Sequence, residues 1–197
     1  DAARDLIQEM LGMRLDRRPV KDTGFGLVYG LGVAGLAKKI GTSRDEAQRL
    51  RTAYLKAMPG IKQLGDVMKA RAKNEEPIYT WGGREYYCEP PAVVKGRIRT
   101  FEYKLINVLI QGSAADNTKE ATCRYWESRD QNDGARFVMT VHDETVANAQ
   151  KSNMKRAMAR LRDAMESVEF DLPMLSDGKT GPTWAKLTKF NDERTAT

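Results

Sequence analysis

Apolar residues recur at helical spacing through the first third of the chain. Gly41 is typical of a helix end, Ser43 and Glu46 have the spacing of a capping box that starts the next helix, and Pro59 should break that helix. The pattern predicts helices over residues 2–13, from about 16 onward, over 31–40, and from 44 until the pattern changes near Pro77.

The rest of the chain mixes alternating runs with two further helical stretches. Glycines near position 82 and charged residues near 143 are typical of the turns that join two strands. We therefore predict a hairpin over 78–87, an irregular basic stretch over 92–99, a long helix over 100–128, a hairpin of strands 136–141 and 145–148, a helix over 153–168, an edge strand over 170–175 and a frayed tail from 191.

Three glycines interrupt the second predicted helix, at positions 24, 26 and 30. Each costs roughly 1 kcal/mol relative to alanine in a helix interior. We therefore expect a bend or a close approach there, and a glycine surface of this kind would let a base pair approach the backbone.

Composition excludes several classes of protein. The 197 residues, 41% hydrophobic and 30% charged, suit one large domain or two small ones, and neither a membrane-spanning run nor a signal peptide is visible. Cys88 and Cys123 lie far apart without metal-binding spacing, and a single histidine, His142, excludes a His-rich zinc site. The net charge of +6 suits a polyanionic partner.

Arg17, Lys21, Phe25 and Tyr29 recur every four residues and should share one side of a helix. Two cations followed by two aromatic rings could bind the phosphates of a nucleotide and stack on its sugar or base. The alternative is a surface helix whose aromatic residues enter a core.

Asp143 and Glu144 are adjacent at a predicted turn, and paired carboxylates suit magnesium. The alternative is a solvated acidic turn, and one pair of acids is too few for two metal ions. His142 could pack in a core or donate a hydrogen bond to nucleic acid. Asn107 and Gln111, four residues apart on the long helix, could donate to minor-groove acceptors or be exposed amides without a role.

Three segments and the end of the chain resemble a known family. Residues 17–30, RRPVKDTGFGLVYG, resemble the fingers motif of family A DNA polymerases, the class of bacterial polymerase I. Residues 107–116, NVLIQGSAAD, are similar to that family's palm helix, and residues 141–144, VHDE, to its carboxyl-side metal motif. Residues 177–184, DGKTGPTW, look like the C-terminus of bacteriophage replicative members.

The resemblance implies roles for the residues of the fingers motif. Arg17 and Lys21 would bind the phosphates of the incoming deoxynucleotide (dNTP), and Phe25 would face its sugar and base. Phenylalanine at position 25 implies discrimination against nucleotides that lack a 3′-hydroxyl. Tyr29 would guard the templating position.

The other two motifs imply a catalytic site that works with two magnesium ions. Asp143 would be a metal ligand, Glu144 would support the site near the primer end, and His142 would contact the primer strand. Asn107 and Gln111 would follow the minor groove of the new duplex.

The chain also departs from the family pattern. Tyr103 stands where many members have arginine, and Ala3 stands near the expected position of a phosphate-binding histidine. The strand that carries the family's first metal-binding aspartate is not recognisable in this sequence. We therefore expect an N-terminal segment or subunit to supply that aspartate and the thumb.

Together these observations predict an α+β chain, with mostly helical polymerase fingers over 1–98 and the C-terminal half of an antiparallel palm over 99–197. The predicted activity is that of a DNA-directed DNA polymerase, a nucleotidyltransferase acting on primer-template DNA and dNTP. The resemblance implies no membrane partner and a cytoplasmic location in a bacterium or a phage-infected host. The alternatives are a non-catalytic nucleic-acid-binding module that keeps this fold, and a scaffold protein.

Overall fold

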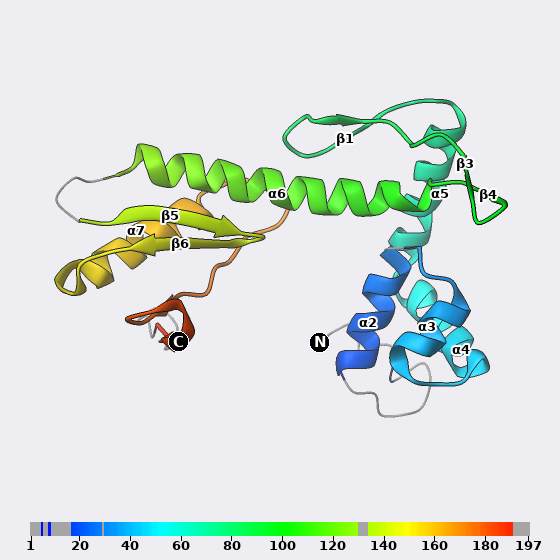
Figure 1. Cartoon of the computed structure of the whole chain (residues 1–197), viewed down its shortest axis with the longest axis horizontal. Coiled ribbons are helices and arrows are strands. Elements are labelled where there is room, and N and C mark those ends of the chain that lie inside the picture. The colour runs from blue at the N-terminus through cyan, green and yellow to red at the C-terminus, as the bar shows by residue number, and fades with distance from the viewer. Residues whose placement is uncertain (1–4, 6–7, 9–16, 29, 130–133, 191–197) are drawn as a thin grey trace. The chain divides into compact units, whose positions relative to one another are not determined.

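The computed structural model describes residues 5, 8, 17–28, 30–129 and 134–190. The fold is α+β, as predicted, with helices and small antiparallel two-stranded sheets (Figure 1). The chain divides into two compact units, 1–112 and 113–197. The predicted helix over 2–13 and the predicted tail from 191 lie outside the described residues, apart from positions 5 and 8.

The helices of the first unit follow the sequence pattern closely. The second predicted helix begins at Arg17, and Pro59 occupies the first position of a new helix, so the predicted break is confirmed. A proline is tolerated there because its missing N–H would have no partner within the helix. Before the first hairpin, the described helices are α2 (Arg17–Val28), α3 (Val33–Ile40), α4 (Arg44–Ala57) and α5 (Pro59–Lys73).

The boundary between α3 and α4 is set by local chemistry. Gly41 is left-handed, with φ 71°, and its N–H donates to the carbonyl of Ala37. The Ser43 hydroxyl accepts a hydrogen bond from the Glu46 N–H at 3.1 Å. The Glu46 carboxylate accepts a hydrogen bond from the Thr42 hydroxyl. The predicted capping box is therefore formed on the serine side, while the Glu46 side chain bonds to Thr42.

Helix α2 packs closely on α4 through a face that contains a glycine. Val20 joins Leu50 and Tyr54 in a buried cluster, and Gly24 lies against the Tyr54 ring. A Cβ added to Gly24 would lie 2.5 Å from the Tyr54 hydroxyl oxygen, and one added to Gly26 would lie 3.3 Å from the Leu31 side chain. Close approach therefore explains these glycines, as expected. The idea that they admit a base pair is wrong for Gly24 and Gly26, because protein side chains cover both.

Gly30 follows α2 in the left-handed region, with φ 69°. Its Cα faces Tyr103, since an added Cβ would lie 2.5 Å from the tyrosine ring. This glycine provides both the bend and the close approach that the sequence predicted.

A second core cluster joins α5 to the long helix α6 (Tyr103–Glu127) through a hairpin. The predicted hairpin over 78–87 is confirmed as β1 (Ile78–Tyr79) paired with β2 (Glu85–Tyr86). Its inner face contributes Ile78, which is buried with Met68 of α5. Helix α6 contributes Leu105 and Ile106 to the same cluster.

The prediction of an irregular stretch over 92–99 is wrong. These residues form a second hairpin, in which β3 (Ala92–Val94) pairs with β4 (Arg97–Arg99). Its turn consists of Lys95 and Gly96, with φ values of 52° and 72°. Positive φ at both central residues is typical of the tight turn whose twist matches that of the flanking strands, and glycine favours it.

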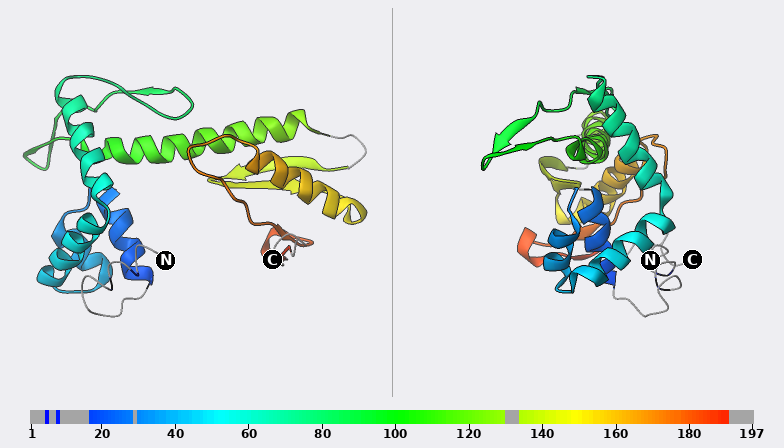
Figure 2. Two further views of the ribbon diagram at one scale, coloured as in Figure 1. Left: turned by 180° about the vertical axis from the view of Figure 1, so that it is seen from behind. Right: turned by 90° about the vertical axis from the view of Figure 1, so that its right-hand side faces the viewer.

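The second unit combines the later part of α6 with a hairpin and a helix. Strands β5 (Arg136–Val141) and β6 (Glu144–Asn148) pair in antiparallel fashion, which confirms the predicted hairpin. The hairpin lies beside α7 (Figure 2). Ala147 of β6 packs on a buried cluster that joins α6 to α7. The cluster consists of Tyr125, Leu161 and Ala164.

The smaller elements of the second unit differ in part from the prediction. Helix α7 (Met154–Glu166) follows the 3-10 turn η1 (Lys151–Asn153), in agreement with the expected helix over 153–168. No strand forms over 170–175, where Pro173 lacks an N–H and no neighbouring strand pairs with the segment. The final strand pair is β7 (Lys179–Thr180) with β8 (Thr188–Lys189), and η2 (Trp184–Lys186) lies between them.

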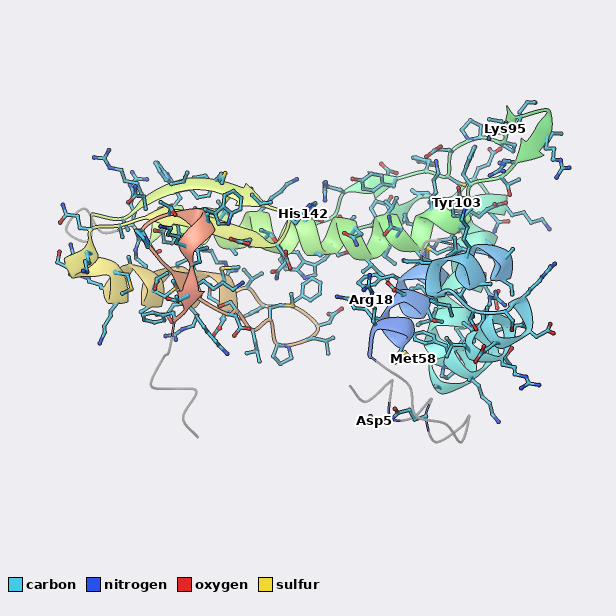
Figure 3. The ribbon with its side chains drawn as sticks, turned by 60° about the horizontal axis from the view of Figure 1, so that its bottom comes forward. Asp5, Arg18, Met58, Lys95, Tyr103 and His142 are labelled. Atoms are coloured by element: carbon cyan, nitrogen blue, oxygen red, sulfur yellow. The ribbon has the colours of Figure 1, made fainter. Side chains whose placement is uncertain are left out.

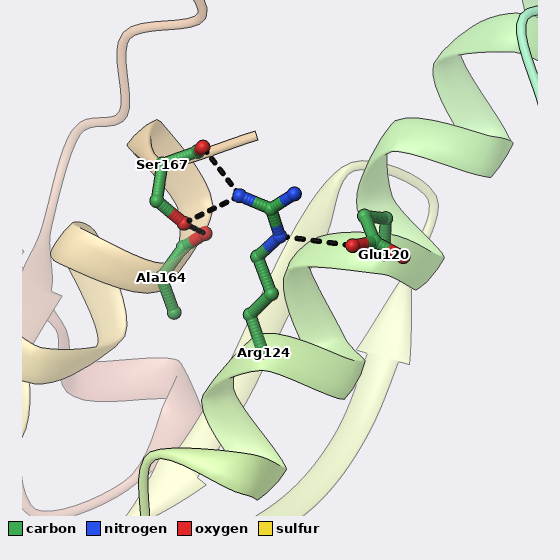
Figure 4. Close-up of polar contacts among 4 residues, drawn as sticks. All are labelled: Glu120, Arg124, Ala164 and Ser167. Atoms are coloured by element: carbon green, nitrogen blue, oxygen red, sulfur yellow. Dashed lines mark hydrogen bonds and ion pairs between the residues drawn. The ribbon is translucent and has the colours of Figure 1, made fainter. Parts of the chain in front are cut away.

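Arg124 links α6 to the C-terminal end of α7 (Figure 4). Its Nε lies 2.9 Å from Glu120 Oε1 on the same helix. Its Nη1 donates to the carbonyl and to the hydroxyl of Ser167, and this hydroxyl in turn donates to the carbonyl of Ala164. Because the last carbonyls of a helix have no partner within it, the arginine satisfies an otherwise open helix end.

We expect Gly24→Ala to destabilise the first unit by about 1–3 kcal/mol, the usual cost of forcing extra atoms into a packed site. The new methyl group would collide with the Tyr54 hydroxyl and ring. Urea denaturation of the purified chain measures the change.

Gly60→Ala is the matched control, because nothing lies within 4 Å of a Cβ at that position. It should leave the unfolding free energy unchanged or raise it by up to about 1 kcal/mol. Tyr54→Phe should recover part of the loss in Gly24→Ala, and equal stability of the two glycine variants would contradict the packing argument.

Candidate functional site

Helix α2 presents one cation and one aromatic ring on its exposed face. Val20 and Thr23 are buried, while Lys21 and Phe25 are exposed. The Lys21 ammonium lies 5.5 Å from the centroid of the Phe25 ring, within range of a cation–π contact. The structure therefore brings these two predicted residues together on one side of the helix.

The acidic residue next to Lys21 bonds elsewhere. Asp22 lies 3.7 Å from the Lys39 ammonium and 3.9 Å from the Arg18 guanidinium. Within the described part of the chain, no carboxylate forms an ion pair with Lys21. The charge of Lys21 thus remains available to an anion.

Two members of the predicted row are described only in part or not at all. Arg17 is the first residue of α2, one helical turn before Lys21, and its side chain lies outside the described residues. Tyr29 lies wholly outside them.

Helix α6 carries the predicted amide pair on one face. Asn107 is half-buried and Gln111 is exposed, one turn apart. The Asn107 Oδ1 is buried and accepts no hydrogen bond from any residue that the structure describes. Tyr103, one turn before Asn107, lies against Gly30, so the residue that replaces the family's arginine has a packing role.

Sequence reasoning missed the contact that holds α6 beside Gln111. The Arg84 guanidinium donates to the carbonyl of Gly112 at 2.9 Å, and Thr80 packs against the Cα of that glycine. An added Cβ on Gly112 would lie 2.6 Å from Thr80 Cγ2. A glycine within a long helix was the available signal, but its partners lie about thirty residues earlier and cannot be identified from spacing.

The turn between β5 and β6 presents the predicted acidic pair. Val141 pairs with Glu144, which leaves His142 and Asp143 as the two turn residues. Figure 3 labels His142 at this turn. All three polar side chains are exposed, and none forms a hydrogen bond or ion pair with another described residue. His142 has φ 56°, a left-handed conformation that costs a non-glycine residue about 1 kcal/mol or more.

The carboxylates at this turn fit part of a magnesium site. Mg²⁺ prefers oxygen ligands and binds through one or two carboxylates, with water and substrate phosphates completing its shell. Asp143 and Glu144 offer such oxygens, and no side chain among the described residues competes for them. Over the described ranges, no group of three or more His, Cys, Asp or Glu residues could hold a metal ion, so this pair supplies only part of a ligand set.

The candidate residues therefore fall into two groups. Lys21, Phe25, Asn107 and Gln111 belong to the first unit. The turn residues His142 and Asp143, with Glu144 at the start of β6, belong to the second.

Two other polar clusters have structural roles. A shallow cavity of about 470 Å³ lies beside Arg124 and Arg160, which already bond to main-chain carbonyls at the α6–α7 contact. On the outer face of the β1–β2 hairpin, Tyr79 and Tyr87 both donate to Glu85 Oε1. The charge of Glu85 raises the pKa of the Tyr79 phenol, and its hydrogen bond raises the pKa of the Tyr87 phenol.

No helix in the described portion is both long and apolar enough to cross a membrane.

Comparison with known proteins identifies the family. The sequence model of DNA polymerase family A matches residues 7–186. The chain therefore belongs to the family A DNA polymerases.

Individual relatives agree with this assignment. The chain is 33% identical over 175 residues to DNA polymerase I of Chloroflexus aurantiacus, covering 87% of this chain and 19% of the relative. It is 34% identical over 174 residues to DNA polymerase I of Geobacillus stearothermophilus, with 85% and 20% covered. It is 30% identical over 188 residues to DNA polymerase theta of Caenorhabditis elegans, with 93% and 12% covered. The chain spans about a fifth or less of the length of these relatives.

A solved structure shares the fold. The POL domain of Pol1 from M. smegmatis, in complex with DNA primer-template and dNTP, superposes with a TM-score of 0.73 at 25% identity. The match covers 88% of this chain and 32% of that one.

We expect His142→Gly to raise the unfolding free energy by up to about 1 kcal/mol, because glycine adopts positive φ without the steric penalty of a Cβ. His142→Val should lower it, since a β-branched residue is least tolerated there. Urea denaturation measures the unfolding free energy of both variants. The unfolding free energy of His142→Asn should lie between the two values. A valine variant as stable as the glycine variant would contradict the strained turn.

Proposed function

We propose that this chain forms the nucleotide-binding and primer-end portion of a DNA-directed DNA polymerase. The reaction would join the primer 3′-oxygen to the α-phosphorus of a dNTP and release pyrophosphate. The observation that carries the proposal is the exposed Lys21–Phe25 pair in a family A sequence, with no carboxylate on the ammonium among the described residues.

The α2 face would bind the incoming nucleotide. Lys21, together with Arg17 one turn earlier, would neutralise the triphosphate, and charge-assisted contacts with phosphate are among the stronger hydrogen bonds. The Phe25 ring would lie against the sugar and base and favour nucleotides that carry a 3′-hydroxyl. Tyr29 would guard the templating position.

The β5–β6 turn would serve the primer end. Asp143 would be a metal ligand, Glu144 would support the site, and the His142 side chain would contact the primer strand. Two magnesium ions in the complete site would supply charge neutralisation at the reacting phosphate. The exposed turn, free of competing partners within the described residues, supports this role.

The amides of α6 would monitor the new duplex. Gln111 is exposed and Asn107 lies on the same face one turn earlier, so both could donate to the acceptors that all base pairs present in the minor groove. The contact of Arg84 with Gly112 supports this role, because it ties α6 to the β1–β2 hairpin next to Gln111.

The remaining parts of the proposal concern the whole enzyme. The fingers would cover residues 1–98 and the returning half of the palm 99–197, and another segment would supply the first palm aspartate and the thumb. Activity would then require both parts. A bacteriophage source, suggested only by residues 177–184, and a cytoplasmic location stay predictions.

A primer-extension assay with Mg²⁺ tests the proposal, using this chain with and without a second polypeptide that carries the first palm aspartate. Asp143→Ala should reduce extension by about 10³-fold or more, because a lost metal ligand costs several kcal/mol of transition-state stabilisation. Lys21→Ala should raise the KM for dNTP by about 10- to 100-fold, the usual range for a charged hydrogen bond.

Exposed residues outside the proposed site provide the matched controls. Asp171→Ala and Lys62→Ala remove the same charges and should extend primers like the parent chain. Unchanged extension in Asp143→Ala would overturn the metal assignment. DNA binding without extension under any condition would instead favour a non-catalytic binding module, and no binding at any salt concentration would favour a scaffold.

A further inference from the structure

The β3–β4 hairpin is a basic segment of the first unit that the proposed function does not use. Residues 92–99, AVVKGRIR, contain three cations and no acid. Lys95 lies at the tip of the hairpin (Figure 3), and Arg97 and Arg99 follow on β4. Such a charge balance suits a polyanion.

The two faces of the hairpin differ in chemistry. Val93 pairs directly with Ile98, so these side chains share one face, and they are 73% and 78% exposed. Because side chains alternate along a strand, Arg97 and Arg99 lie on the opposite face. The hairpin is therefore a two-stranded ribbon with an uncovered apolar pair on one side and two guanidinium groups on the other.

The cations of the hairpin are not neutralised by any acid that the structure describes. No residue in the described ranges forms an ion pair with Lys95, Arg97 or Arg99. Glu89, an acid shortly before β3, pairs instead with Lys104 at 2.8 Å. The positive charge of the ribbon thus remains available for a partner.

We propose that the β3–β4 hairpin is an auxiliary contact for duplex DNA, separate from the nucleotide-binding face of α2. The proposal rests on the proposed function, which gives this chain a DNA substrate. A two-stranded ribbon fits the major groove, where Val93 and Ile98 would meet apolar base edges such as the thymine methyl group. The arginines and Lys95 would pair with phosphates along the groove.

Duplex DNA fits this surface better than the alternatives. Single-strand binding surfaces depend on aromatic side chains that stack on the bases, and residues 92–99 contain none. The core of a protein–protein interface is depleted of charge, and specific interfaces bury roughly 1,000 Å² or more, which two aliphatic side chains do not approach. In contact with duplex DNA, by contrast, Lys95, Arg97 and Arg99 would all pair with phosphates.

The salt dependence of DNA binding tests the proposal. Fluorescence anisotropy would measure the affinity of the whole chain for a labelled duplex between about 50 and 200 mM salt, without dNTP or magnesium. Each phosphate contact contributes about 0.9 to the slope of log K against log salt. The double variant Arg97→Ala and Arg99→Ala should therefore lower the magnitude of the slope by about 1.8.

Two further double variants serve as controls. Lys62→Ala with Lys73→Ala removes the same charge from exposed positions on α5, and the slope should stay like that of the parent. Arg97→Lys with Arg99→Lys keeps both cations and should restore most of the slope. A slope that falls equally in the α5 variant would overturn the proposal, because the effect would then be one of overall charge.

The apolar pair gives an independent readout. Val93→Ser with Ile98→Ser should weaken duplex binding at every salt concentration without changing the slope. If this variant instead abolished self-association in gel filtration and left DNA binding unchanged, the surface would be a protein interface and the proposal would be wrong. A loss confined to single-stranded DNA would overturn the duplex assignment.

Failure of this inference can be separated from failure of the proposed function. If the parent chain bound no DNA at any salt concentration, the proposed function itself would fail. If the parent bound duplex DNA and the arginine variant bound it with the same slope, only the role of the hairpin would fail.

Discussion

The packing of Gly24 against the Tyr54 ring is the constraint on which the exposure of Lys21 and Phe25 depends. Without a Cβ at position 24, α2 can approach α4 closely enough to bury Val20 beside the ring. Burying that face turns the opposite one outward, and it carries Lys21 and Phe25. The glycine is costly within a helix, and the packing that it permits offsets this cost.

The long helix α6 is also positioned by side chains that pack against glycines, at two places. The Tyr103 ring lies over Gly30 at the end of α2, and Thr80 lies over Gly112 within α6, where Arg84 adds a hydrogen bond to the carbonyl. In each case a missing side chain admits a neighbour, and the contact then resists rotation of the helix because any shift meets a packed group. These contacts therefore determine the orientation of the α6 face that carries Asn107 and Gln111.

The two groups of candidate residues are held in place by different interactions. The α2 face is presented by a packed helix, whereas His142 and Asp143 are held by a two-residue turn whose backbone is strained at the histidine. Strain of this kind persists where the surrounding structure imposes it, here the register that pairs Val141 with Glu144. The pairing of β5 with β6 therefore determines how Asp143 and Glu144 are oriented.

Local chemistry explains what could be predicted from the sequence alone. Helical periodicity, Gly41, Ser43 and Pro59 determined the helices of the first unit, and the family motifs identified the candidate residues. The hairpin over 92–99 was missed because its signal is a single Lys-Gly turn between short strands, and the strand predicted over 170–175 is absent because a strand requires a partner. Only the tertiary structure decided that Tyr54 covers Gly24, that Arg84 reaches Gly112 and that Tyr103 packs on Gly30, because these contacts join residues far apart in the chain and leave no periodic trace in the sequence.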